Sequence, residues 1–284
     1  MDLNESVSRC LEGAYDLHVH SSPSLSPRIV NDFELLADAD AAGMAGVLIK
    51  NHDEPTSSRA SLSMLAVRPR KAQCYGGLVL NYPAGGINPC AVETAAKTGA
   101  KEIWFPTCDA KNDLEFNRLQ HSSGHHGITV LNKQGRLLPE VYEVFDVAKQ
   151  YGLSLGTGHL SLAEIEQVCS EGIRCGVRMV FTHPEWRSVA APLELQIKLR
   201  NLGVLLEKAW VPVALGDVRK EELIHSLRVL GPENVYLVTD HGADYLKKPI
   251  DAMRDYISAL LESGFDVSEL NTMLRENPQR VLGI

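Results

Sequence analysis

Short apolar runs alternate with amphipathic segments along the whole chain. The runs are apolar at nearly every position instead of every second one, and this pattern indicates strands that are buried on both faces. Eight such runs occur, at residues 15–20, 46–52, 74–81, 102–107, 153–159, 178–183, 203–209 and 235–240.

The segments between the runs repeat apolar residues with a helical period. Most of them end in glycine, which favours the left-handed conformation that closes many helices. Ser161 and Glu164 add a capping-box pattern at the start of one segment. The pattern predicts helices at 32–43, 88–99, 139–152, 161–172, 192–203 and 219–231, followed by two more at 249–264 and 267–277.

Strands that alternate with helices form βα units around a parallel sheet. Eight units in about 240 residues match the size of a (β/α)8 TIM barrel. A doubly wound open sheet is the alternative, but no GxGxxG turn follows the first run. We therefore predict an α/β protein, a (β/α)8 TIM barrel that forms a single domain over residues 1–284. Residues 110–138 are expected to be an insertion after strand four, with a small hairpin at 128–138 that turns at Gln134 and Gly135.

Composition narrows the classes of partner. Hydrophobic residues make up 44% of the chain, which is enough for a large core. The net charge of −8 argues against a nucleic-acid surface, and the basic run 68–71 is short enough to be the solvated end of a helix before a strand. No apolar segment reaches the length of a signal peptide or a membrane span. We expect a cytoplasmic protein, a homo-oligomer with a small-molecule substrate and no nucleic-acid or membrane partner.

The six cysteines are scattered and form no CxxC pair, so neither a disulfide framework nor a structural zinc knuckle is expected. We interpret most of them as small buried residues of a reducing compartment. Cys108, directly after a strand, is the best candidate for a catalytic thiol among them.

The ends of the predicted strands carry the chemistry. In a TIM barrel the reacting side chains come from the C-terminal strand ends. Five of the ten histidines fall at these positions, together with a lysine and several acidic or polar residues. The residues are His18, His20, Lys50, His52, Asn81, Thr107, His159, His183, Glu207 and Asp240.

His18 and His20 lie two residues apart on a strand, so both point to the same face. Two neutral imidazoles that converge on one point are typical ligands of zinc and related ions. A pair of exposed histidines is the alternative, but Leu17 and Val19 mark a buried strand. The pair therefore predicts a metal site.

His159 and His183 end consecutive strands. Either one alone could be a core histidine or a helix cap, but together they predict a site for one or two divalent ions. Asp240 ends an apolar strand and can both ligate metal and accept a proton, with a helix N-cap as the alternative. His241 should point away from this centre.

Lys50 and His52 repeat the two-residue spacing on the second strand. A lysine is costly to bury unless it is paired or modified. Lys50 could stabilise an oxyanion, bind a substrate carboxylate or, once carboxylated, bridge two metals; an exposed loop lysine is the alternative. The sequence leaves three roles open for Glu207: a metal ligand, an acid/base group, or a structural partner of an arginine or lysine.

The order DLHVH (16–20), His159, His183 and Asp240 resembles the amidohydrolase superfamily of metal-dependent hydrolases. The resemblance covers the chain up to ENPQRVLGI (276–284), which is similar to the closing helix of that superfamily. The segments at 50–60, 80–89 and 105–110 resemble a largely uncharacterised amidohydrolase-like branch.

The resemblance implies a barrel with one or two divalent ions, most often zinc, with manganese as another option. His18, His20 and Asp240 would hold the first ion, and His159 and His183 would hold a second or orient the water. Metal-activated water would attack a carbonyl carbon of a small amide, cyclic amide or lactone, chiefly at non-peptide C–N bonds. Asp240 would move the proton, with His183 and Lys50 as further catalytic candidates.

One departure from that superfamily leaves the number of ions open. Many members carry a bridging lysine or glutamate at the end of strand four, where this chain has Thr107, Cys108 and Asp109. Lys50, Glu207 or His52 could complete the ligand set in its place.

Three other functions stay open. The DLHVHSS opening also resembles phosphoesterases of the polymerase-and-histidinol-phosphatase type, although those separate the closing Asp and His by one residue, whereas Asp240 and His241 are adjacent. A metal-dependent decarboxylase is a second possibility, with Arg187 holding a carboxylate. A ligand-binding barrel without catalysis is the third.

The loops at 82–88, 110–127 and 184–190 are expected to shape the pocket. The cluster of His121, His125 and His126 is expected to be a polar loop.

Overall fold

The computed structural model describes residues 2–118 and 126–284. Its eight strands are hydrogen-bonded in sequence order, and every neighbouring pair is parallel. The strands are β1 (Tyr15–Val19), β2 (Gly46–Ile49), β3 (Gln73–Val79), β4 (Ala100–Trp104), β5 (Ser154–Gly156), β6 (Arg178–Phe181), β7 (Leu205–Ala209) and β8 (Val235–Val238).

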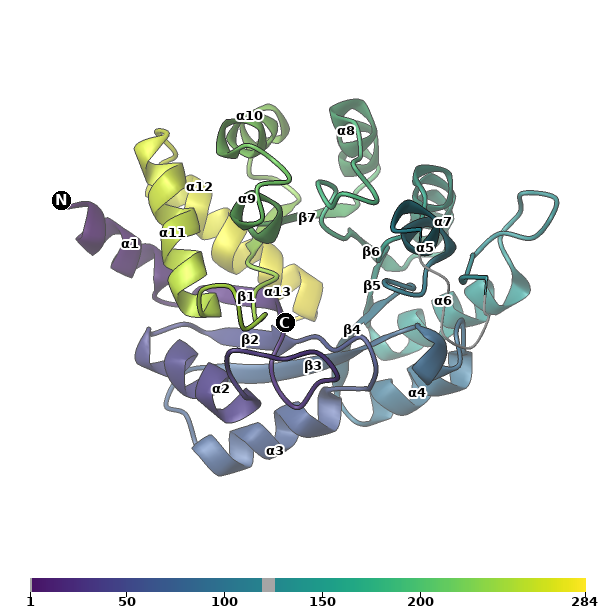
Figure 1. Cartoon of the computed structure of the whole chain (residues 1–284), viewed down its shortest axis with the longest axis horizontal. Coiled ribbons are helices and arrows are strands. Elements are labelled where there is room, and N and C mark those ends of the chain that lie inside the picture. The colour runs from purple at the N-terminus through teal and green to yellow at the C-terminus, as the bar shows by residue number, and fades with distance from the viewer. Residues whose placement is uncertain (1, 119–125) are drawn as a thin grey trace.

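The last strand returns to the first. Asp240 N donates to His18 O at 2.9 Å, and His20 N donates to His241 O at 2.8 Å. These bonds bring β8 beside β1, so the sheet curves into a barrel within a ring of helices (Figure 1). The predicted (β/α)8 TIM barrel with a single domain is confirmed.

The helices follow the predicted order, and four of them were not predicted. The helices are α1 (Leu3–Leu11), α2 (Asp32–Ala41), α3 (Ser57–Val67), α4 (Pro89–Lys97), α5 (Lys111–Phe116), α6 (Pro139–Tyr151), α7 (Leu162–Arg174), α8 (Leu193–Asn201), α9 (Val211–Ala214), α10 (Lys220–Leu230), α11 (Pro249–Glu262), α12 (Val267–Asn271) and α13 (Asn277–Leu282). The unpredicted ones are α1, α3, α5 and α9. A 3₁₀ turn (Tyr82–Ala84) follows β3, and a π-helical turn (Thr272–Glu276) joins α12 to α13.

The predicted helix 267–277 therefore continues past Pro278 through α13. Pro278 is tolerated because it stands in the first turn of α13.

Two apolar layers explain why the strands are apolar at nearly every position. One set of side chains fills the barrel, with Leu17, Leu48, Trp104 and Val180 among its members. The other set packs between the strands and the helices. Because successive strand residues point to opposite faces, a strand inside a ring of helices buries both of them.

Helix α13 covers the N-terminal mouth of the barrel. Val281 and Leu282 join the interior cluster, and the carbonyl of Val281 accepts a hydrogen bond from Ser154 Oγ at 2.6 Å at the start of β5. The barrel is closed at this end, so a pocket has to open at the C-terminal ends of the strands.

The insertion after β4 is part helix and part hairpin. Leu131 pairs antiparallel with Leu137, and Gly135 N donates to Asn132 O at 2.9 Å, so the small hairpin has its turn where it was predicted. His121 and His125 lie outside the described residues, and His126 is exposed.

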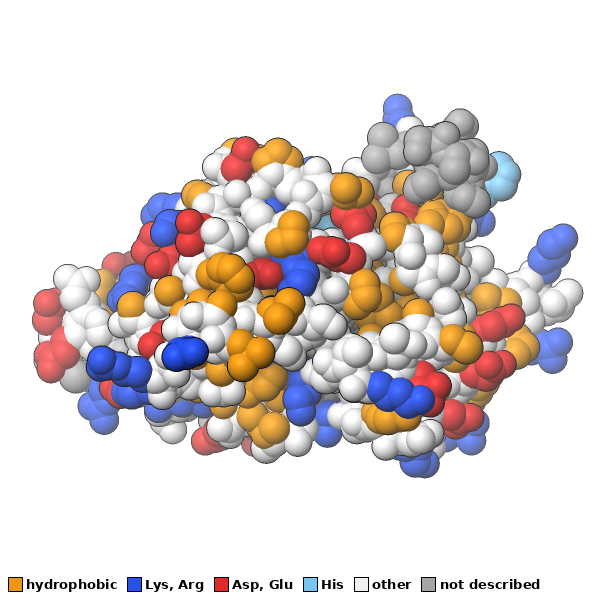
Figure 2. All heavy atoms as spheres, turned by 90° about the horizontal axis from the view of Figure 1, so that it is seen from below, with side chains coloured by type: hydrophobic (Ala, Val, Ile, Leu, Met, Phe, Trp, Pro, Cys, Tyr) orange, Lys and Arg blue, Asp and Glu red, His pale blue; other side chains and the backbone are white. Residues whose placement is uncertain are grey.

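The face of the molecule shown in Figure 2 carries charges of both signs. On the face shown in Figure 2, lysine and arginine side chains lie scattered among acidic and apolar ones. Within residues 2–118 and 126–284, none of the helices is long and apolar enough to cross a membrane. Cys10, Cys74 and Cys169 are buried as expected, whereas Cys90 and Cys108 are exposed.

Candidate metal centre

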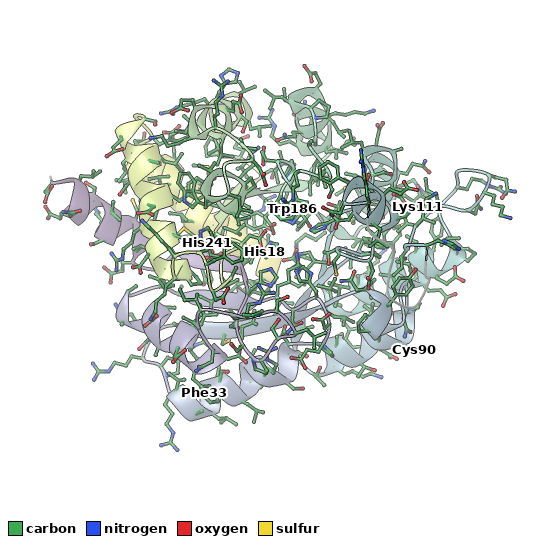
Figure 3. The ribbon with its side chains drawn as sticks, viewed as in Figure 1. His18, Phe33, Cys90, Lys111, Trp186 and His241 are labelled. Atoms are coloured by element: carbon green, nitrogen blue, oxygen red, sulfur yellow. The ribbon has the colours of Figure 1, made fainter. Side chains whose placement is uncertain are left out.

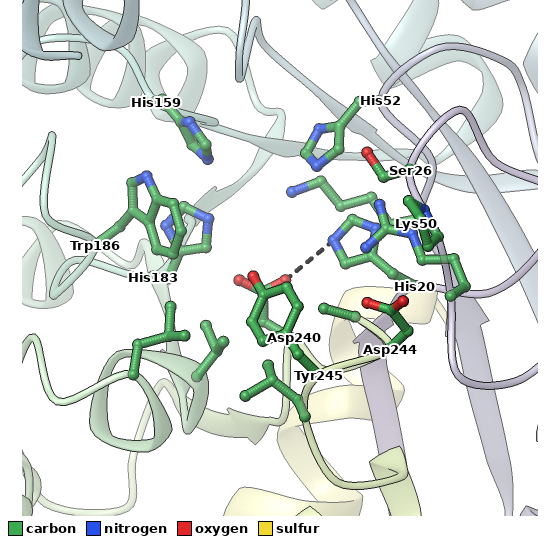
Figure 4. Close-up of a pocket in the computed structure, with 16 residues that line it drawn as sticks. His20, Ser26, Lys50, His52, His159, His183, Trp186, Asp240, Asp244 and Tyr245 are labelled. Atoms are coloured by element: carbon green, nitrogen blue, oxygen red, sulfur yellow. Dashed lines mark hydrogen bonds and ion pairs between the residues drawn. The ribbon is translucent and has the colours of Figure 1, made fainter.

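A cavity of about 420 Å³ opens at the C-terminal mouth of the barrel. Figure 3 shows His18 and Trp186 near the centre of the ring of helices, with Cys90 towards its outer side. Residues from five strand ends line the cavity, and Figure 4 shows their side chains converging. They are His20, Lys50, His52, His159, His183 and Asp240.

His18 lies beneath this cavity, fully buried on β1. Its Nδ1 donates to Glu207 Oε1 at 2.8 Å, and Glu207 Oε2 accepts a hydrogen bond from the Tyr236 hydroxyl at 2.9 Å. Because Nδ1 is engaged, Nε2 is the nitrogen that faces the strand ends. A carboxylate that fixes the second nitrogen of a ligating histidine is common in metal sites. Of the roles left open for Glu207, the geometry fits this orienting one.

Asp240 brings the histidines of β1 together. Its Oδ1 lies 3.0 Å from His18 Nε2 and 3.1 Å from His20 Nε2. A third ligand comes from His183 after β6: one ligand atom each of His18, His183 and Asp240 lie within 4.8 Å of one another. The group joins His18 and Asp240, which were predicted for the first ion, to His183, which was predicted for a second ion or for orienting the water. His20, the third residue predicted for the first ion, is not in the group.

His159 stands beside His183, with ring centroids 5.0 Å apart. Its Nδ1 donates to Asp113 Oδ1 at 3.0 Å, so its Nε2 is left for the cavity. The same Asp113 oxygen accepts from Ser188 Oγ at 2.5 Å. Asp113 lies on α5, within the insertion, and sequence reasoning missed it.

Lys50 lies inside the cavity and not on an exposed loop. Its side chain is almost fully buried, and its Nζ is 2.9 Å from His18 Nε2. The ammonium also lies 5.2 Å from the centre of the Trp104 ring, a favourable cation–π distance. The alternative of an exposed loop lysine is excluded.

His52 stacks on His20, with ring centroids 4.9 Å apart. Its Nδ1 lies 2.8 Å from Thr107 Oγ1, at the end of β4. Asn81 Nδ2 also donates to this hydroxyl, at 2.9 Å. Thr107, which stands where many amidohydrolases carry a bridging lysine or glutamate, therefore positions His52.

Electrostatics favour a positive charge beside His18 Nε2. Burial alone would lower the pKa of His18, but the carboxylates of Asp240 and Glu207 outweigh it and raise this pKa to about 9. Burial lowers the pKa of His20 to about 3, which keeps this imidazole neutral. Burial opposes the charge of Asp240, yet His18 and His20 hold its pKa well below the usual range. A ligating histidine must be deprotonated, so an ion bound at His18 Nε2 would displace this proton.

The donor set fits a divalent transition metal. Two imidazoles and one carboxylate, all buried or nearly so, match zinc, iron or manganese better than calcium or magnesium, which prefer oxygen ligands. Nδ1 of His183 is buried and has no hydrogen-bond partner among the described residues, which leaves a ring nitrogen available. His18, His183 and Asp240 would hold the ion. His20 contacts Asp240, and the His159 ring lies beside that of His183, but neither belongs to this group of three.

The backbone is strained at two of these ligands. Asp240 has a φ of +52° and His183 a φ of +24°, in the left-handed region that most residues avoid. Such conformations cost about 1–3 kcal/mol each and cluster at functional sites.

Several expectations about the rim were wrong. The loop 82–88 and the described part of 110–127 do not line the cavity, and Trp186 is the lining residue of 184–190. Arg187 is exposed and lies 5.2 Å from the centre of the Trp186 ring, outside the lining. The rim comes instead from 26–28, 211–215 and 243–246. His241, as expected, points away, with its Nδ1 donating to Thr239 O at 2.9 Å.

The fold and the site together define a (β/α)8 barrel with a histidine–aspartate centre at the C-terminal ends of its strands. The chain belongs to a family of unknown function, DUF6282, whose model matches residues 13–207. The matched part includes the strand-end residues from His18 to Glu207, and Asp240 follows it. No curated protein matches the chain.

Solved structures share the fold over nearly the whole chain. An amidohydrolase from Pseudomonas aeruginosa has a TM-score of 0.67 at 12% identity, and the match covers 100% of both chains. An enzyme engineered for organophosphate hydrolysis from a promiscuous lactonase has a TM-score of 0.61 at 14% identity, with 95% of each chain covered. A 2,6-dihydroxybenzoate decarboxylase from Rhizobium has a TM-score of 0.54 at 12% identity, covering 96% of this chain and 99% of the other. At these identities the likeness shows the fold.

Proposed function

We propose that the protein is a metal-dependent hydrolase that cleaves an amide, cyclic amide or lactone of a small molecule. The observation that carries the proposal is the convergence of His18, His183 and Asp240 at the open end of a barrel whose other end is closed. The fold neighbours described as an amidohydrolase and as derived from a lactonase support the same class of reaction.

A bound divalent ion, zinc first and manganese second, would supply Lewis-acid polarisation and lower the pKa of a coordinated water. The residues of the chain supply the rest. Asp240 is ionised at neutral pH and accepts the proton of the attacking water, then returns it to the leaving group. Lys50 Nζ, fixed at 2.9 Å from His18 Nε2, places a positive charge where the carbonyl oxygen becomes negative. Trp186, Val211 and Leu215 form an apolar wall that limits water in the cavity.

A metal-dependent decarboxylase is the second candidate. The buried ammonium of Lys50 could pair with a carboxylate at the floor of the cavity, and one fold neighbour is a decarboxylase. The geometry does not favour the phosphoesterase alternative, because His241 does not line the cavity.

The test begins with the metal content of the purified protein, measured by plasma mass spectrometry beside His18→Ala. We expect near-stoichiometric transition metal in the wild type and little in the variant. The protein is then assayed with lactones, cyclic amides and N-acyl compounds, before and after chelation, with CO2 release from aromatic acids measured in parallel. A protein that binds no transition metal loses the proposed function, and CO2 release without hydrolysis favours the decarboxylase.

A further inference from the structure

We propose that Arg28 binds a carboxylate of the substrate, so that the substrates are small organic acids with an apolar body. This inference builds on the proposed function for the reacting group, but it concerns a different part of the cavity. The carboxylate would lie at the rim beside Arg28, while the carbonyl to be attacked would lie at the floor beside His18 and Asp240.

The loop that carries Arg28 is fixed in place. Ile29 N donates to Gly242 O at 2.9 Å, and Arg28 itself pairs antiparallel with Ala243 in the loop after β8. Asn51 Nδ2 donates to Pro23 O at 3.1 Å, which ties the same loop to the end of β2. Arg28 therefore presents its side chain to the cavity from a backbone held at both neighbouring strand ends, and such preorganisation lowers the entropy cost of binding.

The guanidinium group of Arg28 lacks a carboxylate partner among the described residues. Its hydrogen bond there runs from Nε to Ser24 Oγ at 3.3 Å, which leaves the two terminal nitrogens as donors. Arg59 is a useful comparison, since it forms ion pairs with Asp32 at 2.8 Å and with Glu54 at 2.6 Å. Burial lowers the pKa of Arg28, although Asp240, Asp53 and Tyr245 act to raise it. A partly buried cation with free donors that lines a cavity is a binding site for an anion.

The chemistry of the rim favours a carboxylate over a phosphate. A guanidinium fork matches the two oxygens of a carboxylate. The described lining offers one arginine at the rim, and Asp244 and Asp240 add negative charge to the same cavity. Arg28 and Lys50 offset Asp240 and Asp244 in the lining, so a phosphate dianion would leave twice the excess negative charge that a carboxylate leaves.

The wall between floor and rim defines the body of the substrate. Trp186, Val211, Leu215 and Leu246 line the cavity as apolar surface. A volume of about 420 Å³ lies within the usual range of small-molecule sites. The class that fits is a small acid with an aromatic or aliphatic body and a hydrolysable carbonyl at the far end.

The test uses benzoate and benzamide, which differ in charge but hardly in shape. The full-length protein as purified is treated with phenylglyoxal, which modifies arginine, and peptide mass spectrometry follows Arg28 and the exposed Arg187 in the same sample. We expect benzoate to slow modification of Arg28 about tenfold and benzamide to have little effect, with Arg187 modified at the same rate throughout. Equal protection by both probes, or protection by neither, overturns the proposal. Inorganic phosphate that protects better than benzoate overturns the carboxylate assignment.

Calorimetry with Arg28 and Arg187 variants tests the same contact by affinity, and metal analysis separates it from the proposed function. Arg28→Gln should bind benzoate about tenfold more weakly, Arg28→Lys should recover part of the loss, and Arg187→Gln should bind as the wild type does. Unchanged affinity in Arg28→Gln overturns the proposal. Metal content is measured on every sample. If benzoate protects Arg28 in a protein that contains no metal, the carboxylate site stands and the proposed hydrolase is wrong. If the protein contains metal but benzoate does not protect Arg28, the carboxylate site is wrong and the proposed hydrolase stands.

Discussion

Glu207 on β7 and His18 on β1 form a fully buried contact. Oε1 of Glu207 lies 2.8 Å from Nδ1 of His18, although the two residues are 189 positions apart in the chain. Glu207 does not line the cavity, and it contacts His18, a proposed metal ligand, at the ring nitrogen that faces away from the cavity. Its effect on chemistry must therefore pass through the orientation and basicity of the His18 ring.

We expect Glu207→Gln to lower metal affinity about 10–100-fold, because an amide is a weaker acceptor for the Nδ1 proton and leaves the ring less basic. Competition with a chromophoric chelator measures the affinity. Tyr236→Phe is the matched control: it removes the hydroxyl that donates to Glu207 Oε2 but keeps the carboxylate, so its effect should be smaller. Equal affinity in Glu207→Gln and the wild type would show that the contact is structural only.

The number of ions is the second quantity to measure. The described residues bring one group of three ligand atoms together, and Lys50 Nζ lies 2.9 Å from Nε2 of His18, one of the three residues. We expect one transition-metal ion per chain and an intact mass without a CO2 adduct on Lys50. Lys50→Met should keep the single ion and lower turnover. Two ions in the wild type and one in Lys50→Met would instead identify Lys50 as a carboxylated bridge.

A third expectation concerns stability and pH away from the centre. Asp40, at the end of α2, accepts hydrogen bonds from the backbone N–H groups of Ala72, Lys71 and Arg70, and these lower its pKa. A carboxyl group whose pKa falls on folding stabilises the protein above its unfolded pKa, about 3.9, and loses this contribution as the pH falls through the folded pKa.

Asp40→Asn should therefore unfold at lower urea concentration than the wild type at pH 5–7, and the difference should shrink below about pH 4. Asp38→Asn on the same helix is the control, since Asp38 pairs with the exposed ammonium of Lys248. A gap between Asp40→Asn and wild type that stays constant down to pH 3 would contradict the assignment.

The fold was predictable because barrel strands leave a strong local signal. Residues 46–49 and 235–238 are apolar at every position, a pattern typical of strands buried on both faces. The site followed from the fold, because parallel strands bring their C-terminal ends to one mouth. His18, His183 and Asp240 could be placed together without any knowledge of the loops.

The supporting residues could not be found in the same way. Asp113 and Arg28 lie outside the strands, on an insertion helix and a loop, where no periodic pattern reports which direction a side chain takes. Arg187 shows the opposite error, since it was predicted to hold a substrate carboxylate and does not line the cavity. It was chosen because it follows β6 by only a few residues, as many pocket residues of a barrel do. The turn in which Trp186 N donates to His183 O at 2.8 Å directs Trp186 inward and leaves Arg187 outside. Such directions depend on tertiary contacts.

Gly242 offers a test of how the rim is held. A Cβ atom there would lie 1.9 Å from the carbonyl oxygen of His20, and its φ of +140° is one that other residues rarely adopt. Its own carbonyl accepts the hydrogen bond from Ile29 N, so displacement of Gly242 would also move the loop that carries Arg28. The absence of a side chain at this position thus lets the β8 loop pack against β1 and keeps Asp240 beside His20.

We expect Gly242→Ala to lose more than about 3 kcal/mol of unfolding free energy and to bind metal weakly, because backbone and not a flexible side chain would have to shift. Gly203→Ala separates the cost of the positive φ from the cost of the steric clash. Gly203 also has a positive φ, +93°, but nothing lies within 4 Å of its Cβ position, so the cost should be about 1–2 kcal/mol. Chemical denaturation and metal titration measure both variants. If Gly242→Ala is no less stable than Gly203→Ala and retains its metal, the close packing of the β8 loop on β1 does not hold the centre together.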